Sequence, residues 1–159
     1  MANQPNSPIA EQQHLETNAW LCILLGIVFA LQSAQDVINS LLANLSYASI
    51  AFDMIFVLLL ITLVVLTVKT AVFSKNMHWR SVWHQYYEDE FLNLINLSGY
   101  KWAFNVTLLF LFASFLAFDS KLVASELYNI GHFAQLSIGV AGLYYGLRIF
   151  TLVKGSDDE

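Results

Sequence analysis

The sequence predicts an all-α protein, a four-transmembrane-helix bundle built from two helical hairpins that a cytoplasmic amphipathic helix joins. Of its 159 residues, 57% are hydrophobic and only 12% are charged, about half the charge of an ordinary globular domain. The apolar residues gather in runs near the ~20 residues that cross ~30 Å of hydrocarbon. One long polar segment, residues 74–101, separates two apolar halves. These observations indicate a single membrane domain, residues 19–154.

Both ends of the chain are polar. Residues 1–18 contain two prolines and no Lys or Arg, so we expect a flexible N-terminal tail without the basic region of a secretory signal peptide. Residues 155–159 form an acidic tail. Between the tails, the four spans are expected at about residues 19–38, 48–68, 102–118 and 130–153.

The first span needs polar residues to reach the length of a membrane crossing. Its purely apolar run, 19–31, is too short, so the helix must continue to about Ile38. The polar residues after this run are spaced i, i+3, i+4 and i+7, so they share one face, which we assign to the bundle interior. They are Gln32, Gln35, Asp36 and Asn39. Alternatively, the helix ends at Ser33 and these residues form a loop.

The other spans carry two further signals. The second span has the most apolar core, residues 54–68, and follows the first after a short connection, which makes the two antiparallel neighbours. The fourth span carries Gly139, Gly142 and Gly146 along one side, and the last two form a GxxxG pair that lets another helix approach closely. The approaching helix belongs either to the same chain or to a second copy.

The central segment, residues 74–101, is predicted to be an amphipathic helix at the membrane surface. Its aromatic residues recur at helical spacing, and their rings suit the boundary between headgroups and acyl chains. The expected interfacial anchors are Trp79, Trp83, Tyr86 and Tyr87. We expect the chain to turn inward at Ser98 and Gly99. The alternative is a soluble cytoplasmic helical hairpin.

The positive charges predict the orientation. Six of the seven Lys and Arg residues border the central segment or the C-terminus, and only Lys121 lies in a short connection. By the positive-inside rule, both termini and the central segment are cytoplasmic. All four tryptophans then fall at the inner interface: Trp20, Trp79, Trp83 and Trp102.

A candidate polar pocket follows from this topology at the outer ends of the spans. Carboxylates and an imidazole there could hold a cation or pass protons, because burial raises the pKa of a carboxylic acid and His titrates near neutral pH. Asp36 and Asp53 are expected to face each other across the first hairpin. The alternative is that helix ends simply carry polar residues at the water boundary. The candidate members are Asp36, Asp53, Asp119, His132, Gln32, Gln35 and Gln135.

Several function classes lack support in the sequence. No GxSxG, HExxH, Walker-type or GxGxxG motif is present, so we expect neither an enzyme nor a cofactor. The net charge of -5 and the lack of a basic patch argue against nucleic-acid binding. Cys22 is the single cysteine, which excludes an intramolecular disulfide and a thiolate metal cluster.

Residues 87–104, YEDEFLNLINLSGYKWAF, carry a resemblance that covers under a quarter of the chain. Through Asp89, Glu90, Ile95 and Ala103 the segment resembles small four-helix bacterial inner-membrane proteins of uncharacterised function. Phe91 departs from the more basic residue of that pattern. The resemblance implies a bacterial inner (plasma) membrane location, and it transfers no activity and no site residues.

The expected function is that of a small polytopic membrane protein acting as an accessory, sensory or interaction subunit. Its expected partners are the lipid bilayer and either a second copy, as a homodimer, or a membrane or cytoplasmic protein. The acidic run Glu88, Asp89 and Glu90 would suit a basic partner. The alternative is a homo-oligomeric transporter or channel for a cation or a proton-coupled solute, which requires a water-filled path along the polar face of the first span.

Overall fold

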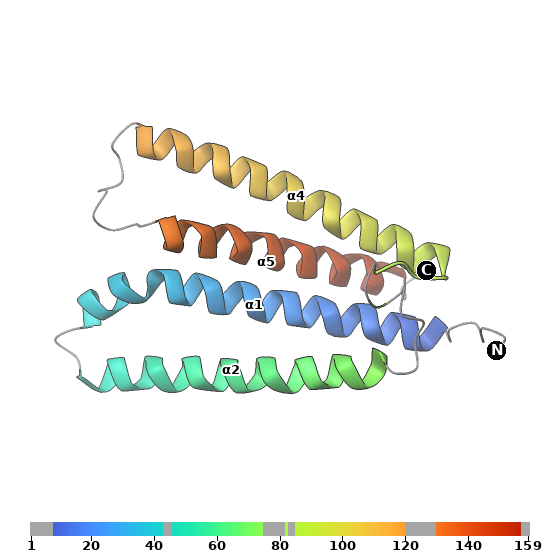
Figure 1. Ribbon diagram of the computed structural model, residues 1–159, viewed down its shortest axis with the longest axis horizontal. Coiled ribbons are helices and arrows are strands. Elements are labelled where there is room, and N and C mark those ends of the chain that lie inside the picture. The colour runs from blue at the N-terminus through green and yellow to red at the C-terminus, as the bar shows by residue number, and fades with distance from the viewer. Residues whose placement is uncertain (1–7, 43–45, 75–81, 83–84, 120–129, 157–159) are drawn as a thin grey trace.

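Four long helices make up the computed structural model, which describes residues 8–42, 46–74, 82, 85–119 and 130–156. They are α1 (Pro8–Leu42), α2 (Ser46–Ser74), α4 (Glu90–Asp119) and α5 (Ile130–Ser156) (Figure 1). Each contains a stretch long and apolar enough to cross a membrane. The prediction of an all-helical protein with four candidate membrane spans is therefore confirmed for the described part of the chain.

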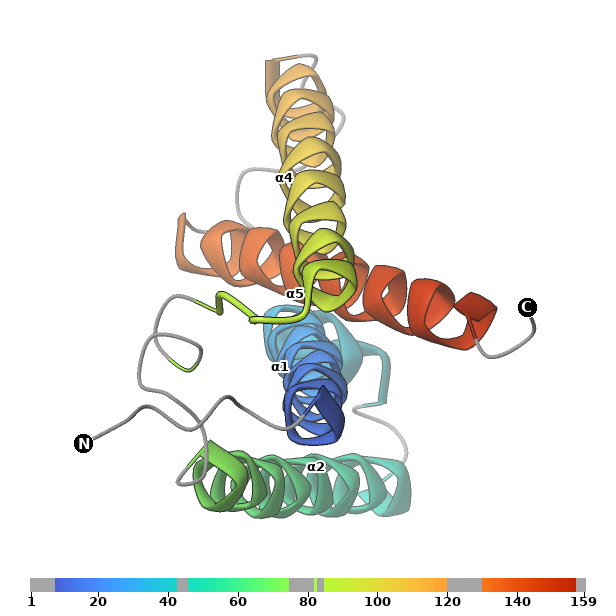
Figure 2. The same ribbon diagram turned by 90° about the vertical axis from the view of Figure 1, so that its right-hand side faces the viewer.

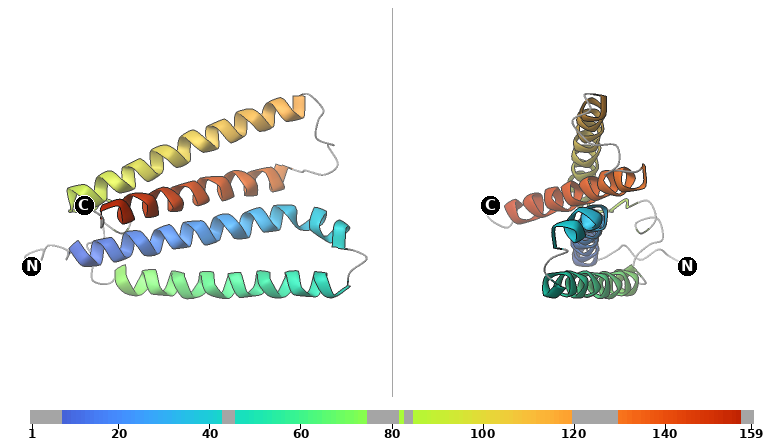
Figure 3. Two further views of the ribbon diagram at one scale, coloured as in Figure 1. Left: turned by 180° about the vertical axis from the view of Figure 1, so that it is seen from behind. Right: turned by 90° about the vertical axis from the view of Figure 1, so that its left-hand side faces the viewer.

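The helices stand side by side in a row. Figure 2 shows the order α4, α5, α1 and α2, and Figure 3 shows the same row from behind. α1 therefore lies between α2 and α5, and α4 contacts mainly α5. Towards Asp119, α4 diverges from α5, so the row opens at that end.

α1 begins at Pro8, well before the predicted start of the first span. Residues 8–18, which the sequence placed in a flexible tail, are helical. Pro8 is tolerated there, because the first turn of a helix needs no N–H from it. Glu11, His14, Leu15 and Ala19 follow at i, i+3, i+4 and i+8, and all four are buried. This stripe packs against other elements, which gives the polar start of α1 a reason to be helical.

α4 also begins earlier than predicted, at Glu90, and it continues through Ser98 and Gly99 without the expected inward turn. Asp89 caps it, because its side-chain Oδ1 accepts the N–H groups of Phe91 at 2.9 Å and Leu92 at 3.1 Å. Gly99 serves close packing, since a Cβ there would lie 3.0 Å from the Tyr145 ring on α5.

The central segment therefore differs from a single amphipathic helix where it is described. Residues 85–89 are not helical, and Gln85 has a φ of 49°, in the left-handed region. Residues 90–101 belong to α4. Residues 75–81 and 83–84 lie outside the described part of the chain.

The hydrophobic core gathers at the end of the row where α1 and α4 begin and α5 ends. It joins side chains from three helices and from the segment before α4. Its buried members are Leu15, Ala19, Tyr87, Leu92, Ile95, Ala103, Tyr145, Ile149 and Val153. Tyr87 and Tyr145 of this core also hydrogen-bond to buried polar side chains of α1 and α4.

Candidate functional site

A buried polar cluster lies in the core end of the row and ties residues 85–89 to three helices. The cluster combines side chains that are far apart in the sequence. Its members are Glu11 and His14 of α1, Gln85 and Tyr87 before α4, Asn96 of α4 and Tyr145 of α5.

Glu11 holds the backbone immediately before α4. Its side chain is 1% exposed, and its carboxylate accepts two backbone N–H groups, from Glu88 to Oε1 at 3.0 Å and from Asp89 to Oε2 at 3.1 Å. A buried carboxylate is strongly destabilising unless it is paired or hydrogen-bonded. The two charge-assisted bonds meet that requirement and fix the chain at its entry into α4.

His14 makes the second connection. Its Nδ1 lies 3.2 Å from the hydroxyl oxygen of Tyr87, and both side chains are 1% exposed. Burial raises the pKa of the Tyr87 phenol, so the hydroxyl keeps its proton. The hydroxyl can therefore donate to the imidazole, and the pair locks residue 87 onto α1.

Gln85 makes the third connection. Its backbone carbonyl accepts a hydrogen bond from Nδ2 of Asn96 at 2.7 Å, and its side-chain oxygen accepts one from the Tyr100 hydroxyl. The Tyr145 hydroxyl donates to Oδ1 of Asn96 at 2.6 Å. A left-handed conformation costs a non-glycine residue about 1–2 kcal/mol, and these bonds offset that strain at Gln85.

The hydrogen bonds of the cluster hold residues 85–89 against α1, α4 and α5, so we call it the clamp. Glu11 and Asn96 bond to backbone groups of residues 85–89, and the other bonds join side chains to one another. Within the described residues, no group of three His, Cys, Asp or Glu side chains is placed to hold a metal ion. The arrangement can set the position of residues 85–89, and it presents their outward side chains on a rigid backbone.

The glycines of α5 lie against α1 of the same chain. A Cβ at Gly142 would lie 2.6 Å from the Cys22 carbonyl oxygen, and one at Gly146 would lie 2.5 Å from the Ala19 carbonyl oxygen. Gly139 faces Gly26, because a Cβ at Gly139 would lie 3.0 Å from the Gly26 carbonyl oxygen. We call this contact the glycine seam; it leaves no room between the α1 and α5 backbones along its length.

The members predicted for the outer polar pocket have different surroundings. Asp53 is exposed and lines an open hollow on α2 together with apolar side chains of the same helix: Ile50, Met54, Val57 and Leu58. Gln32 is also exposed, whereas Gln35, His132 and Gln135 are half-buried. The side chains of Asp36 and Asp119 lie outside the described part, so their predicted place in the pocket stays a prediction.

Among the described residues, the buried side-chain atoms without a hydrogen-bond partner include Oγ1 of Thr107 in α4 and Oε1 of Gln135 in α5. Gln135 lies near the open end of the row, close to the start of α5. The open end therefore differs from the core end, where the described cluster satisfies its buried polar groups.

The predicted interfacial anchors that the structure describes differ in their exposure. Tyr86 is 60% exposed, as an anchor requires, but Tyr87 is buried against His14 and cannot reach the membrane surface. This corrects the prediction for Tyr87: adjacent residues in a non-helical segment point to opposite sides. Trp79 and Trp83 lie outside the described residues.

The sequence interpretation missed Glu11, His14, Asn96 and Tyr145. The sequence does indicate that α1 starts early, because Glu11, His14 and Leu15 have helical spacing and lie on the same helix face as Ala19. No local signal pairs them with residues 85–89, since those contacts join residues more than 70 positions apart.

Comparison with protein-family models, curated proteins and solved structures gives no match for this chain.

Proposed function

We propose that the chain is a small integral membrane protein that acts as an accessory or interaction subunit and docks a basic segment of a partner protein. The observation that carries the proposal is the Glu11 clamp, which fixes the backbone of residues 88 and 89. Beside the clamp, the side chains of Tyr86, Glu88 and Glu90 are exposed. We call these three residues the acidic rim.

The acidic rim has the properties of a docking site. Tyr86 offers a large amphipathic ring, a residue type that often dominates binding energy. Two carboxylates beside it complement Lys or Arg side chains and repel acidic partners. Because the clamp already orders this backbone, binding of a partner costs less conformational entropy in residues 85–89.

The proposed orientation puts the acidic rim in the cytoplasm. The starts of α1 and α4 and the ends of α2 and α5 lie at one end of the row (Figure 1). Lys69, Lys101, Arg148 and Lys154 lie in those parts of the helices, so the positive-inside rule supports cytoplasmic termini. In this arrangement two hairpins, α1–α2 and α4–α5, are joined by a cytoplasmic amphipathic segment in a bacterial inner membrane.

The transport alternative has less support. It requires a water-filled path, but the glycine seam closes the space between α1 and α5. Asp53, a proposed member of that path, lies on the exposed side of α2 among apolar residues. An interaction subunit needs no such path.

The test is photo-cross-linking in native membranes. With a photoreactive phenylalanine at position 86, we expect one protein adduct of defined mass, identified by mass spectrometry. The double variant Glu88→Lys/Glu90→Lys should reduce its yield at least fivefold, and reversing the partner's basic residues should restore it. The matched control carries the same photoreactive residue at Tyr144, which is exposed on α5 and should not give this adduct.

A second variant tests the role of the clamp. Glu11→Ala leaves the backbone N–H groups of Glu88 and Asp89 without this acceptor and should lower the yield at position 86 with the rim charges intact. Glu16→Ala is the control, because the Glu16 carboxylate bonds to Gln12 within α1. Adducts to lipid alone at position 86, or a yield that ignores the charges at 88 and 90, would contradict the proposal.

A further inference from the structure

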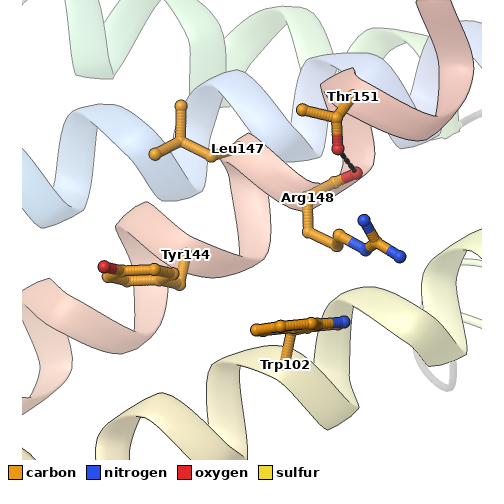
Figure 4. A pocket seen from close by; sticks show the side chains of 5 residues that line it. All are labelled: Trp102, Tyr144, Leu147, Arg148 and Thr151. Carbon is orange, nitrogen blue, oxygen red and sulfur yellow. Dashed lines mark hydrogen bonds between the residues drawn. The ribbon is translucent and has the colours of Figure 1, made fainter. Parts of the chain in front are cut away.

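An open groove lies between α4 and α5, on the side of α5 that faces away from α1 (Figure 4). Its volume is about 220 Å³, and Figure 4 shows the side chains that line it. They are Trp102, Tyr144, Leu147, Arg148 and Thr151. The groove is thus mostly aromatic and apolar, with one guanidinium.

Arg148 carries that guanidinium, and Ser98 and Trp102 of α4 orient it. Its Nε donates to the Ser98 hydroxyl at 3.3 Å, and its Cζ lies 5.5 Å from the centroid of the Trp102 ring. The hydroxyl of Thr151 bonds to the Arg148 backbone carbonyl at 2.9 Å, within α5. In Figure 4 the two terminal nitrogens extend past the nitrogen-bearing edge of the Trp102 indole. The bonds recorded among the described residues use only Nε, so the terminal fork is available to a ligand.

Arg148 lies inside a candidate membrane span, so its charge needs a partner or contact with the headgroup layer. It lies inside the apolar stretch Gly131–Lys154, six residues before its end, about 9 Å at 1.5 Å per residue. A cation inside a membrane helix requires an anion or a route to the headgroups. Trp20, in ring contact with Phe150 at 4.7 Å, and Trp102 suit the membrane interface, the layer that contains lipid phosphates.

We propose that this groove binds the phosphate of an anionic phospholipid. The planar fork of Arg148 matches two phosphate oxygens, and the Trp102 indole N–H is a further donor. The acyl chains would lie along Tyr144 and Leu147, both about half exposed. A lipid fits better than a protein carboxylate, because the groove is open sideways and combines one polar point with apolar walls. Basic pockets between transmembrane helices on the cytoplasmic side bind such headgroups.

Lys101 gives the groove a preference for net negative charge. It is exposed on α4, and with Ser98 and Trp102 it lines a neighbouring hollow of about 390 Å³. A phosphodiester without a compensating ammonium group gains from both cations, whereas a zwitterionic headgroup brings its own positive charge. The inference takes the cytoplasmic orientation from the proposed function but does not depend on the acidic rim, whose residues lie at positions 86–90.

The test uses the purified full chain in detergent and native mass spectrometry. We expect phosphatidylglycerol to bind at least fivefold more tightly than phosphatidylcholine. Arg148→Gln removes the charge and should weaken phosphatidylglycerol binding about tenfold. Lys69→Gln is the matched control: it removes one positive charge on α2, away from the groove, and should leave the affinity unchanged.

Two further variants keep the proposal testable if Arg148→Gln does not fold. Trp102→Phe keeps an aromatic ring without the N–H and should weaken binding about threefold. Lys101→Gln should reduce the preference for phosphatidylglycerol over phosphatidylcholine. Equal affinity for the two lipids, or wild-type binding by all three variants, would overturn the proposal. So would displacement of the lipid by millimolar inorganic phosphate, or a protein in place of a lipid adduct from a photoreactive residue at position 144.

Discussion

The two helices that flank α1 contact it in different ways. α5 brings glycines against the α1 backbone and contributes Tyr145 to the polar cluster. No side chain in residues 50–72 of α2 is buried, and the hydroxyls of Thr62, Thr67 and Thr70 bond within α2 itself. Lipid tails are as apolar as Leu, so burial of apolar surface alone does not drive helix association in a membrane. The comparison indicates that α1–α5 is the specific contact of the fold and α1–α2 the weaker one.

The largest expected effect comes from filling the glycine seam. In Gly142→Leu the new Cβ meets the Cys22 carbonyl oxygen, so the helix backbones must separate and lose their contacts. We expect a loss of about 3 kcal/mol or more in the free energy of unfolding, measured by denaturant titration in detergent. Ala51→Leu adds bulk on the exposed side of α2 and should change it by less than about 0.5 kcal/mol.

Substitution of Gly142 also distinguishes the two interpretations of the GxxxG pair, a contact within one chain and a contact between two copies. Because Gly142 faces α1 of the same chain, its substitution should unfold the monomer as well as any dimer. Selective loss of a dimer with an intact monomer would assign the seam to a contact between copies. Equal effects of Gly142→Leu and Ala51→Leu would remove the distinction between the two sides of α1.

The sequence was sufficient for features that depend on local pattern. Four apolar runs predict four helices, because each run alone meets the length of the membrane, and the spacing of Gly139, Gly142 and Gly146 identifies one face of α5. The start of α4 was harder to predict. It depends on the Asp89 cap, and a surface amphipathic helix competed as an interpretation of the same residues.

The candidate site could not be predicted because it depends on tertiary contacts. Nothing near Glu11 in the sequence indicates that its carboxylate meets the backbone at residues 88 and 89. The exposed position of Asp53 could not be predicted for a related reason. Topology gives the end of the row at which a residue lies, but the direction of its side chain depends on which face of α2 contacts α1.

A smaller effect on the free energy of unfolding is expected from the hydrogen bond between α5 and α4, on the same side of α1 as the glycine seam. Tyr145→Phe keeps the ring and removes the hydroxyl, which leaves the buried Oδ1 of Asn96 without that donor. The expected loss is about 1–2 kcal/mol in the free energy of unfolding. Tyr144→Phe is the matched control, because Tyr144 is the adjacent residue and is exposed. Equal changes in the two variants would mean that the Tyr145 hydroxyl contributes nothing to holding α4 on α5.

The smallest effect is expected on the other side of α1, at Asp53. Its side chain is exposed on α2 beside Ile50 and Met54, so Asp53→Asn removes a charge without leaving a buried partner unpaired. The free energy of unfolding should change by less than about 0.5 kcal/mol. Reconstitution into liposomes supplies the second measurement, since a cation or proton path through Asp53 would give a flux that the variant abolishes. A loss above about 2 kcal/mol would mean that Asp53 meets a polar partner and that α2 is a specific element of the fold, and such a flux would favour the transport alternative.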